Sequence, residues 1–217
     1  MSIQKTIKVT CPGCHAESDF PMWQSINTAV DPGMKEAVRN KQAFRFCCPH
    51  CSEENIVDYS FLYHQPEEKW LIQYDKDDES ANEFLSMVTE EDSSLRQFIE
   101  DGYVIRLVRS QNELIEKLFI LDEGLDDRLV EIYKVLVLLR YQEEHKGEDI
   151  DRPVLYFYRS ADKQPEIQVL INNEYQCSTT FNPDLYQDLQ TNFSPRLSPL
   201  NQDTPVINEQ WAFNFLL

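Results

Sequence analysis

The sequence predicts an α+β fold in which a β-rich N-terminal region carries an inserted helical segment and a small strand–helix module follows. Three observations lead to this prediction. Apolar and polar residues alternate in short runs up to about residue 78, which is typical of strands with one solvated face. Between residues 79 and 146 the apolar spacing changes to three and four, which indicates helices. After residue 150 the strand pattern returns and precedes another helical stretch.

The N-terminal region is predicted to place two strands directly before two tight turns. TIKV alternates and runs into CPGC, and AFRFC runs into CPHC. Asp31-Pro32-Gly33 breaks the chain before a short helix, and QPEE forms the turn of a later hairpin. The expected elements are strands at 4–10, 20–27 and 41–47, a helix from Met34, and a hairpin of strands 55–64 and 69–74.

The following segment is predicted to be mainly helical. Ser80 with Glu83, and Ser110 with Glu113, have the spacing of a capping box, in which a hydroxyl and a carboxylate bond the first free amides. Gly102 suits the C-terminal end of a helix. The expected helices cover 81–88, 93–101, 113–121 and 125–144, with a strand at 103–108. One buried helix face is expected to hold Leu129, Ile132, Tyr133, Leu136 and Leu139.

A domain boundary is predicted at the charged segment 145–153, which contains Gly and Pro and has little to bury. We therefore expect one domain at 1–146, with a β region at 1–78 and a helical part at 79–146, and a C-terminal α+β module at 150–217. In that module we expect paired strands at 154–159 and 166–177 and a helix at 182–190 capped by Asn182. Residues 193–205 should be irregular, and the apolar tail 207–217 should dock onto a neighbouring surface.

The charge of the chain is strongly negative and unevenly distributed. The net charge is −18, yet residues 1–65 carry six Lys/Arg against seven Asp/Glu, so almost all of the excess lies later. Such a chain is repelled by phosphate backbones, which makes nucleic acid an unlikely partner. No apolar run reaches the roughly 20 residues of a membrane span, and no signal-peptide pattern is present at the start. These features predict a soluble cytoplasmic protein.

Four of the six cysteines form two CxxC pairs, Cys11 with Cys14 and Cys48 with Cys51. In a reducing compartment this arrangement indicates metal or redox chemistry. Each turn can supply two corners of the tetrahedron that Zn²⁺ prefers, so the sequence predicts a zinc-ribbon-like region with a closed structural site made of four cysteines. A thioredoxin-like redox pair, and an open catalytic zinc site in which His15 or His50 replaces a cysteine, are the alternatives.

The remaining candidate residues are expected to have structural roles only. Cys47 precedes the second turn and should face away from the metal into packing, and Cys177 should also be buried. His15 and Ser52 directly follow the second cysteine of each turn, a position at which such turns often have glycine. An acidic run at a helix start should stay solvated and complement the helix dipole; it comprises Glu123, Asp126, Asp127 and Glu131.

With CPGC at 11–14 and CPHC at 48–51, the chain resembles the CpXC domain family of bacterial and archaeal proteins. The resemblance covers residues 1 to about 140, including the stretch ELIEKLFILDEGLDDRLVEIYK. It implies metal binding by Cys11, Cys14, Cys48 and Cys51, and it implies no particular reaction.

The hypothesis that the sequence favours is a non-catalytic zinc protein that serves as an adaptor for another protein. An enzyme with its site among the acidic residues of the helical part is the second hypothesis, and the sequence favours it less. The third is nucleic-acid binding by the near-neutral β region through Lys5, Lys8, Lys35, Arg39, Lys41 and Arg45. The sequence does not indicate an oligomeric state.

Overall fold

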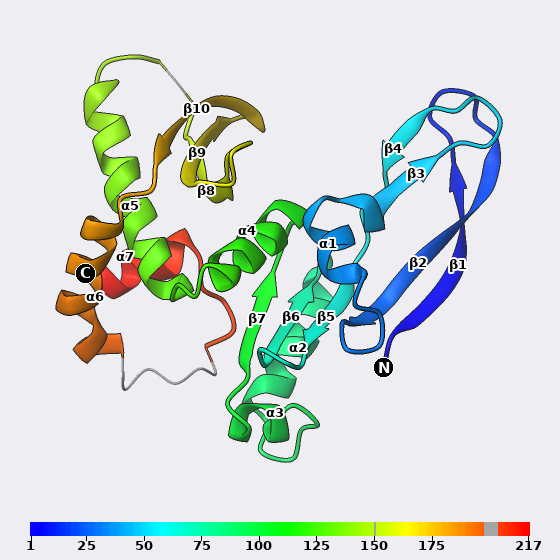
Figure 1. The fold of residues 1–217 in the computed structure, drawn as a ribbon, viewed down its shortest axis with the longest axis horizontal. Coiled ribbons are helices and arrows are strands. Elements are labelled where there is room, and N and C mark those ends of the chain that lie inside the picture. Colours follow the sequence, from blue (N-terminus) through cyan, green and yellow to red (C-terminus); the bar gives the residue numbers. More distant parts are fainter. Residues whose placement is uncertain (150, 198–203) are drawn as a thin grey trace. The chain divides into compact units, whose positions relative to one another are not determined.

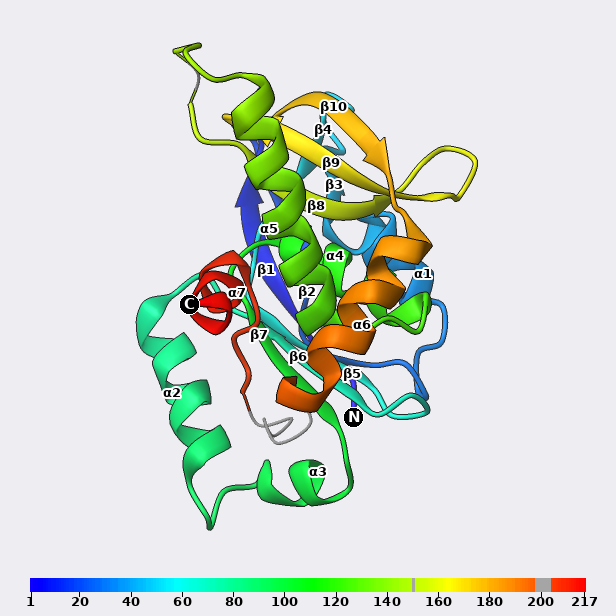
Figure 2. The same ribbon diagram turned by 90° about the vertical axis from the view of Figure 1, so that its left-hand side faces the viewer.

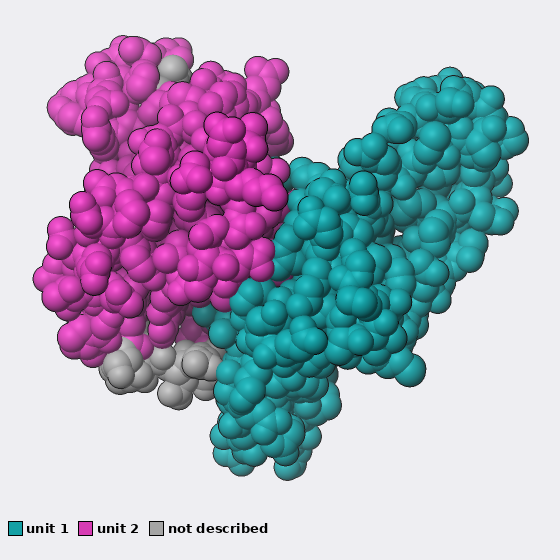
Figure 3. All heavy atoms as spheres, in the orientation of Figure 1, with its two compact units in different colours: residues 1–114 teal, residues 115–217 magenta. Residues whose placement is uncertain are grey.

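The computed structural model describes residues 1–149, 151–197 and 204–217 (Figure 1). It has the predicted mixed α+β composition and divides into two compact units, residues 1–114 and 115–217 (Figure 3). This division does not coincide with the segment 145–153, where the sequence analysis placed a domain boundary. Within the described ranges, every helix is too short or too polar to cross a bilayer.

The first unit is built on a five-stranded sheet with the order β1-β2-β5-β6-β7. Its strands are β1 (Ile3–Thr10), β2 (Glu17–Asn27), β5 (Phe61–Gln65), β6 (Trp70–Tyr74) and β7 (Val104–Val108). The pair β1/β2 is antiparallel along its whole length, whereas β2 meets β5 only through Ser25–Asn27, in parallel. The β1/β2 hairpin therefore extends beyond the rest of the sheet as a ribbon (Figure 1).

A second, two-stranded ladder in this unit carries the other cysteine turn. It consists of β3 (Arg45–Cys47) and β4 (Glu54–Ile56), and it follows α1 (Met34–Arg39) and the 3₁₀ turn η1 (Gln42–Phe44). The predicted single strand 55–64 is wrong, because Ile56 pairs with Arg45 whereas Phe61 opens β5 in the other sheet.

Aromatic rings join this ladder to β2. Phe20 of β2 lies edge-on to Phe46 at 6.2 Å and to Tyr59 at 6.0 Å between ring centroids. Tyr59 in turn lies 5.5 Å from Phe44. All four side chains are buried, so together they form the apolar base from which both cysteine turns project.

Besides α1, the helices of the first unit are α2 (Asp78–Thr89), α3 (Arg96–Glu100) and the beginning of α4 (Gln111–Asp122). The predicted cap of α2 is wrong, because Asp77 caps the helix and accepts the Ser80 amide at 2.9 Å. Gly102 has φ = 80°, the left-handed conformation expected after a helix, and Ser110 accepts the Glu113 amide at 3.1 Å as predicted.

The second unit packs helices against a three-stranded antiparallel sheet of order β10-β9-β8 (Figure 2). Its central helix contacts β8 and both C-terminal helices, and the apolar tail docks as predicted. The elements are α5 (Asp127–Glu144), β8 (Val154–Arg159), β9 (Pro165–Ile171), β10 (Glu174–Thr180), α6 (Pro183–Leu197) and α7 (Glu209–Leu216).

Two boundaries in this unit differ from the prediction. The expected strand 166–177 is a hairpin, because Asn172 and Asn173 both have positive φ, 52° and 65°, and form a tight turn. Asn182 caps α6 as predicted, through the Asp184 amide at 2.9 Å. The helix continues to Leu197, so 193–197 is helical and not irregular. Residues 204 and 205 belong to no helix or strand, as predicted, and the intervening residues 198–203 lie outside the described residues.

The predicted buried face of α5 is only partly correct. Leu129, Ile132 and Tyr133 are buried, whereas Leu136 is 36% and Leu139 50% exposed. The buried side of the helix instead continues through Val130, Glu131, Lys134, Val135 and Leu138. Apolar spacing alone did not predict the whole buried face, because two of the buried positions hold charged residues, Glu131 and Lys134.

These charged residues belong to a buried ion-pair network between α4 and α5. Lys117 lies 3.1 Å from Asp127 and 3.0 Å from Glu131. Lys134 lies 2.7 Å from Glu116 and 3.1 Å from Glu131. The expectation that Asp127 and Glu131 are solvated is therefore wrong; their exposed fractions are 3% and 1%. Burying these charges is tolerable only because each has a partner.

The network holds three carboxyl groups and two ammonium groups, so it carries one excess negative charge. Burial raises the pKa of Glu116 to about 7; Lys134 opposes this shift and the neighbouring Glu131 adds to it. The Oε1 atom of Glu116 also accepts the amide of Phe157 at 2.7 Å, which ties the network to β8. Glu116 is therefore the member that is most easily neutralised.

We predict that Lys134→Met lowers the free energy of unfolding at pH 7 by about 3 kcal/mol, because it leaves three buried carboxyl groups facing one ammonium group. Glu116→Gln should cost less than about 1 kcal/mol, because the remaining charges balance and the amide oxygen still accepts from Phe157. Urea unfolding of both variants checks this. Equal losses would show that charge balance does not govern the network.

A second prediction concerns pH. Because the pKa of Glu116 is raised in the folded chain, to about 7 from 4.5, the folded chain retains a proton that the unfolded chain has released. The resulting stabilisation is complete below the lower pKa and is lost as the pH rises to the higher one. The free energy of unfolding of the wild type, relative to Glu116→Gln, should therefore fall over this interval. A pH-independent difference would contradict the assignment.

Candidate metal centre

The two cysteine turns have the same backbone hydrogen bonds. In the first, the Cys11 amide donates to the Ala16 carbonyl at 3.0 Å and the His15 amide to the Cys11 carbonyl at 2.9 Å. In the second, the Cys48 amide donates to Glu53 at 2.9 Å and the Ser52 amide to Cys48 at 2.9 Å. The repeated CPxC spacing therefore folds twice into one local structure, and the first turn joins β1 to β2 as the second joins β3 to β4.

The residue after each second cysteine adopts the left-handed conformation. His15 has φ = 59° and Ser52 has φ = 61°, the region in which glycine carries no steric penalty. Each L-residue there costs roughly 1–2 kcal/mol. The structure thus explains why glycine is common at this point of such turns, and shows that this chain adopts the same backbone without it.

The turns bring four sulfur atoms together. The Sγ atoms of Cys11, Cys14, Cys48 and Cys51 all lie within 4.8 Å of one another. Across the two turns, Cys11 lies 3.6 Å from Cys51 and Cys14 lies 3.6 Å from Cys48. Sulfur atoms at about 2.3 Å from one tetrahedral ion would be about 3.8 Å apart, whereas a disulfide would be about 2.05 Å. The spacing therefore fits a shared metal ion, and all six cysteines are free thiols.

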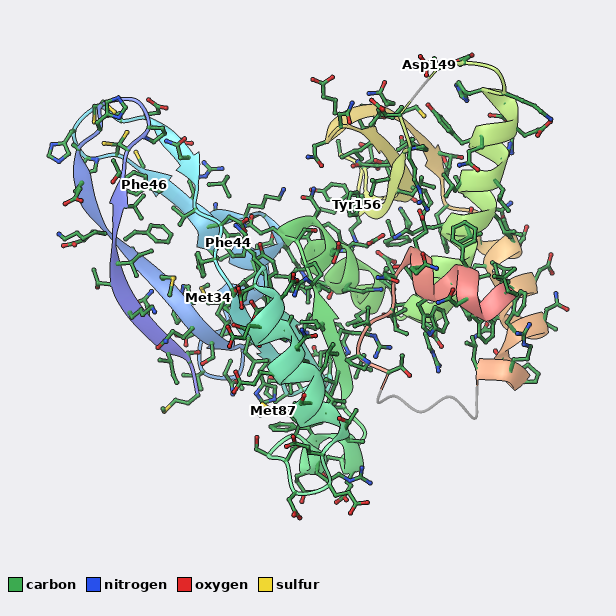
Figure 4. The ribbon with its side chains drawn as sticks, turned by 180° about the vertical axis from the view of Figure 1, so that it is seen from behind. Met34, Phe44, Phe46, Met87, Asp149 and Tyr156 are labelled. Carbon is green, nitrogen blue, oxygen red and sulfur yellow. The ribbon has the colours of Figure 1, made fainter. Side chains whose placement is uncertain are left out.

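The four sulfur atoms lie at the tip of the ribbon made by the two hairpins. Figure 4 shows sulfur atoms gathered at that tip, and the labelled Phe46 lies farther from the end of the ribbon. Cys11 and Cys48, the first cysteine of each turn, are 0% and 1% exposed, whereas Cys14 and Cys51 are exposed. Each turn therefore contributes one buried and one exposed thiol to the cluster.

Backbone amides surround the sulfur atoms. At Cys48, burial opposes the thiolate, but the amides of His50 and Cys51 and the neighbouring thiols of Cys14 and Cys11 lower its pKa to about 6. At Cys51 the Glu53 amide favours the thiolate, but desolvation and the other thiols raise the pKa to about 12. The sulfur of Cys14 similarly receives the Ala16 amide, although its pKa is raised overall.

These shifts show that the cluster readily holds one thiolate but resists a second. A cation at the centre removes that resistance, because it neutralises the accumulated negative charge. Four converging sulfur ligands with amides donating to them are a donor set for a thiophilic ion. At Cys48 these amides follow the proline of the turn, and at Cys14 and Cys51 they belong to Ala16 and Glu53, which the left-handed residue directs at the second sulfur of each pair.

The other candidate ligands stand apart from this cluster. Within the described ranges, no His, Asp or Glu joins the four cysteines in a metal-binding group. Cys47 does not belong to the group of four sulfurs, and its Sγ lies 4.0 Å from the Ser52 carbonyl, but it is exposed and not packed as predicted. Cys177 is exposed as well, so the predicted burial of both is wrong. Cys47 and Cys177 both lie on edge strands, where no apolar layer covers the thiol.

The basic residues considered for nucleic acid mostly contact groups of the protein itself. Lys8 pairs with Asp19 at 2.6 Å, Lys35 with Glu67 at 2.8 Å, and Arg45 with Glu54 at 3.3 Å. Arg39 is buried and donates to the Tyr63 hydroxyl, and Lys41 donates to Asn112. Lys5 is exposed in β1. The six residues therefore do not form a free cationic surface.

A shallow groove adjoins the second cysteine turn. Its volume is about 470 Å³, and its walls include Trp23, Met34, Phe46, Cys47 and Pro49. The sequence predicts Trp23 in the strand 20–27, where it supports the folding of the segment between the cysteine pairs, and Met34 at the start of a short helix. Nothing in their spacing indicated that they share a surface with residues more than ten positions later, because the fold alone brings them together.

Comparisons with known proteins give one match. No curated protein and no solved structure matches the chain. The family described as CpXC protein matches residues 9–134, which is more than half of the chain and includes all four clustered cysteines. The chain belongs to the CpXC protein family.

Proposed function

We propose that Cys11, Cys14, Cys48 and Cys51 bind one zinc ion in a structural role. The observation that carries this proposal is the approach of four sulfur atoms to within 4.8 Å of one another from two turns of equal geometry. Zinc suits a four-thiolate tetrahedron because it has no preferred geometry of its own and is not redox-active. Iron binds similar sets, so metal analysis is part of the test below.

The role we propose for the whole protein is that of a non-catalytic adaptor for another protein in a reducing, cytoplasmic environment. Four protein ligands fill the tetrahedron and leave no position for substrate. Two acidic residues considered for an enzyme site, Asp127 and Glu131, are engaged in buried ion pairs. Five of the six basic residues considered for nucleic acid contact protein groups.

Zinc would hold the free ends of the two hairpins together, and the aromatic cluster holds their bases. The groove shares Phe46 with the aromatic cluster, and Cys47 and Pro49 beside the cysteine site also line it. A rigid ribbon with a groove that includes Trp23 and Met34 is suited to binding a partner, because little conformational freedom is lost on association. This arrangement favours the adaptor over the two other hypotheses.

We predict that the purified chain contains one zinc ion and that Cys48→Ser abolishes its binding. A removed ligand or a strong chelator should lower the melting temperature of the first unit by about 10 °C or more, because the remaining thiolates repel one another and the hairpin ends separate. Cys47→Ser is the matched control, because it removes the adjacent thiol and should retain the metal. Native mass spectrometry and calorimetry provide the measurements.

An unchanged melting temperature after the metal is removed would count against a structural role, and iron in place of zinc would correct the identity of the ion.

For the adaptor role we predict metal-dependent capture of another protein. The zinc-loaded wild type and Cys177→Ser should retain the same partner from a native lysate, and Cys48→Ser should lose it, because only the last variant disrupts the ribbon. Quantitative mass spectrometry of the bound fractions checks this. A wild type that retains nothing above the level of an empty resin would remove the support for an adaptor.

A further inference from the structure

The outer edge of β10 is open in the second unit. The sheet order is β10-β9-β8, so β10 pairs only with β9 among the described strands (Figure 2). All seven residues from Glu174 to Thr180 are exposed. The register to β9 shifts between Tyr175 and Cys177, which leaves Cys177–Thr180 as the regular part of the edge. An open edge presents unpaired main-chain donors and acceptors to any second strand.

The backbone hydrogen bonds show which residues face outward. The Phe181 amide donates to the Pro165 carbonyl of β9 at 3.0 Å. Because successive residues of a strand direct their amide and carbonyl groups to opposite sides, Thr179 and Cys177 also face β9. Ser178 and Thr180 therefore direct their main-chain groups to the open edge.

This edge lacks the usual protection against pairing with another chain. Natural edge strands often carry Lys or Pro, and Tyr175–Thr180 contains neither. Its sequence, YQCSTT, has no charge, although the chain has a net charge of −18. The adjacent groove, which is lined by residues of α5 and β10, also carries no net charge, because its charged residues Arg140 and Glu144 pair with each other at 2.8 Å.

We propose that β10 pairs antiparallel with β10 of a second copy of this chain, about a two-fold axis at Thr179. Two acidic chains repel each other over most of their surfaces, and this uncharged edge lets them meet without opposed like charges. In this register Ser178 lies opposite Thr180 of the second copy, and each such pair exchanges two main-chain hydrogen bonds. The two sheets then become one continuous sheet.

The side chains at the axis give the proposal a distinct geometric consequence. Thr179 faces its counterpart as a non-hydrogen-bonded pair, whose Cα atoms are about 4.5 Å apart. This distance is within the range of about 4.4–6.8 Å that a disulfide bridges. Glu174 of one copy, at the start of the strand, has no such counterpart near it.

The first test uses Ser178→Pro, which removes the outward amide and leaves the pairing with β9 intact. Ser178→Ala is the matched control, because it removes the hydroxyl and keeps the amide. Sedimentation of the zinc-loaded full chain over a concentration series should show a dimer for the wild type and Ser178→Ala. Ser178→Pro should dissociate about tenfold more readily or further, since each copy loses a hydrogen bond. A monomeric wild type, or an undiminished dimer of Ser178→Pro, would overturn the proposal.

The second test does not depend on the folding of a proline variant. In a Cys47→Ser, Cys177→Ser background, Thr179→Cys should form a disulfide-linked dimer when diamide accepts the two electrons and two protons of the paired thiols. Glu174→Cys in the same background is the control and should stay unlinked. Equal cross-linking of both variants would indicate random collision, and no cross-linking of Thr179→Cys would contradict the register.

Discussion

The junction of four sulfur atoms is the constraint on which the first unit depends. The ribbon beyond the central sheet has little apolar material of its own: β1 is exposed at most of its positions, and β3 and β4 contribute three residues each. Backbone pairing of this length is too short to hold two hairpins together. The aromatic cluster around Phe20 and Tyr59 joins their bases, and the four clustered cysteines lie where their tips meet. A metal ion bound there would replace the core that the ribbon lacks.

In the second unit, a buried ion-pair network fixes how two helices meet. Lys117 and Lys134 lie in its interior, where isolated charges are strongly unfavourable, and three carboxyl groups surround them. An apolar core would be at least as stable, so the network's contribution is to fix how α4 and α5 meet, since a shifted helix leaves a buried charge unpaired. In both units, polar groups with strict geometric demands determine the arrangement where apolar packing alone would allow several.

The distribution of charge shapes the surfaces that remain. With a net charge of −18 the chain repels phosphate and other acidic molecules, and the basic residues of the first unit are largely held by neighbouring groups. The edge of β10 from Tyr175 to Thr180 contains no charged residue, and the groove beside the second cysteine turn is lined by one acidic and one basic residue, Asp19 and Arg45. Surfaces without net charge on a strongly charged protein are where association is least opposed, which makes both regions suited to binding.

The sequence by itself determined the features that depend on neighbouring residues. The doubled CPxC spacing indicated both turns and all four cysteines of the cluster, and local patterns placed most strands, the cap of α6 at Asn182 and the end of α3 at Gly102. Only the tertiary structure decided what depends on distant partners. It buried Glu131 because two lysines meet it, and it exposed Cys47 because no apolar layer covers that strand. Periodicity reports which residues share a face, but burial and charge state depend on what packs against that face.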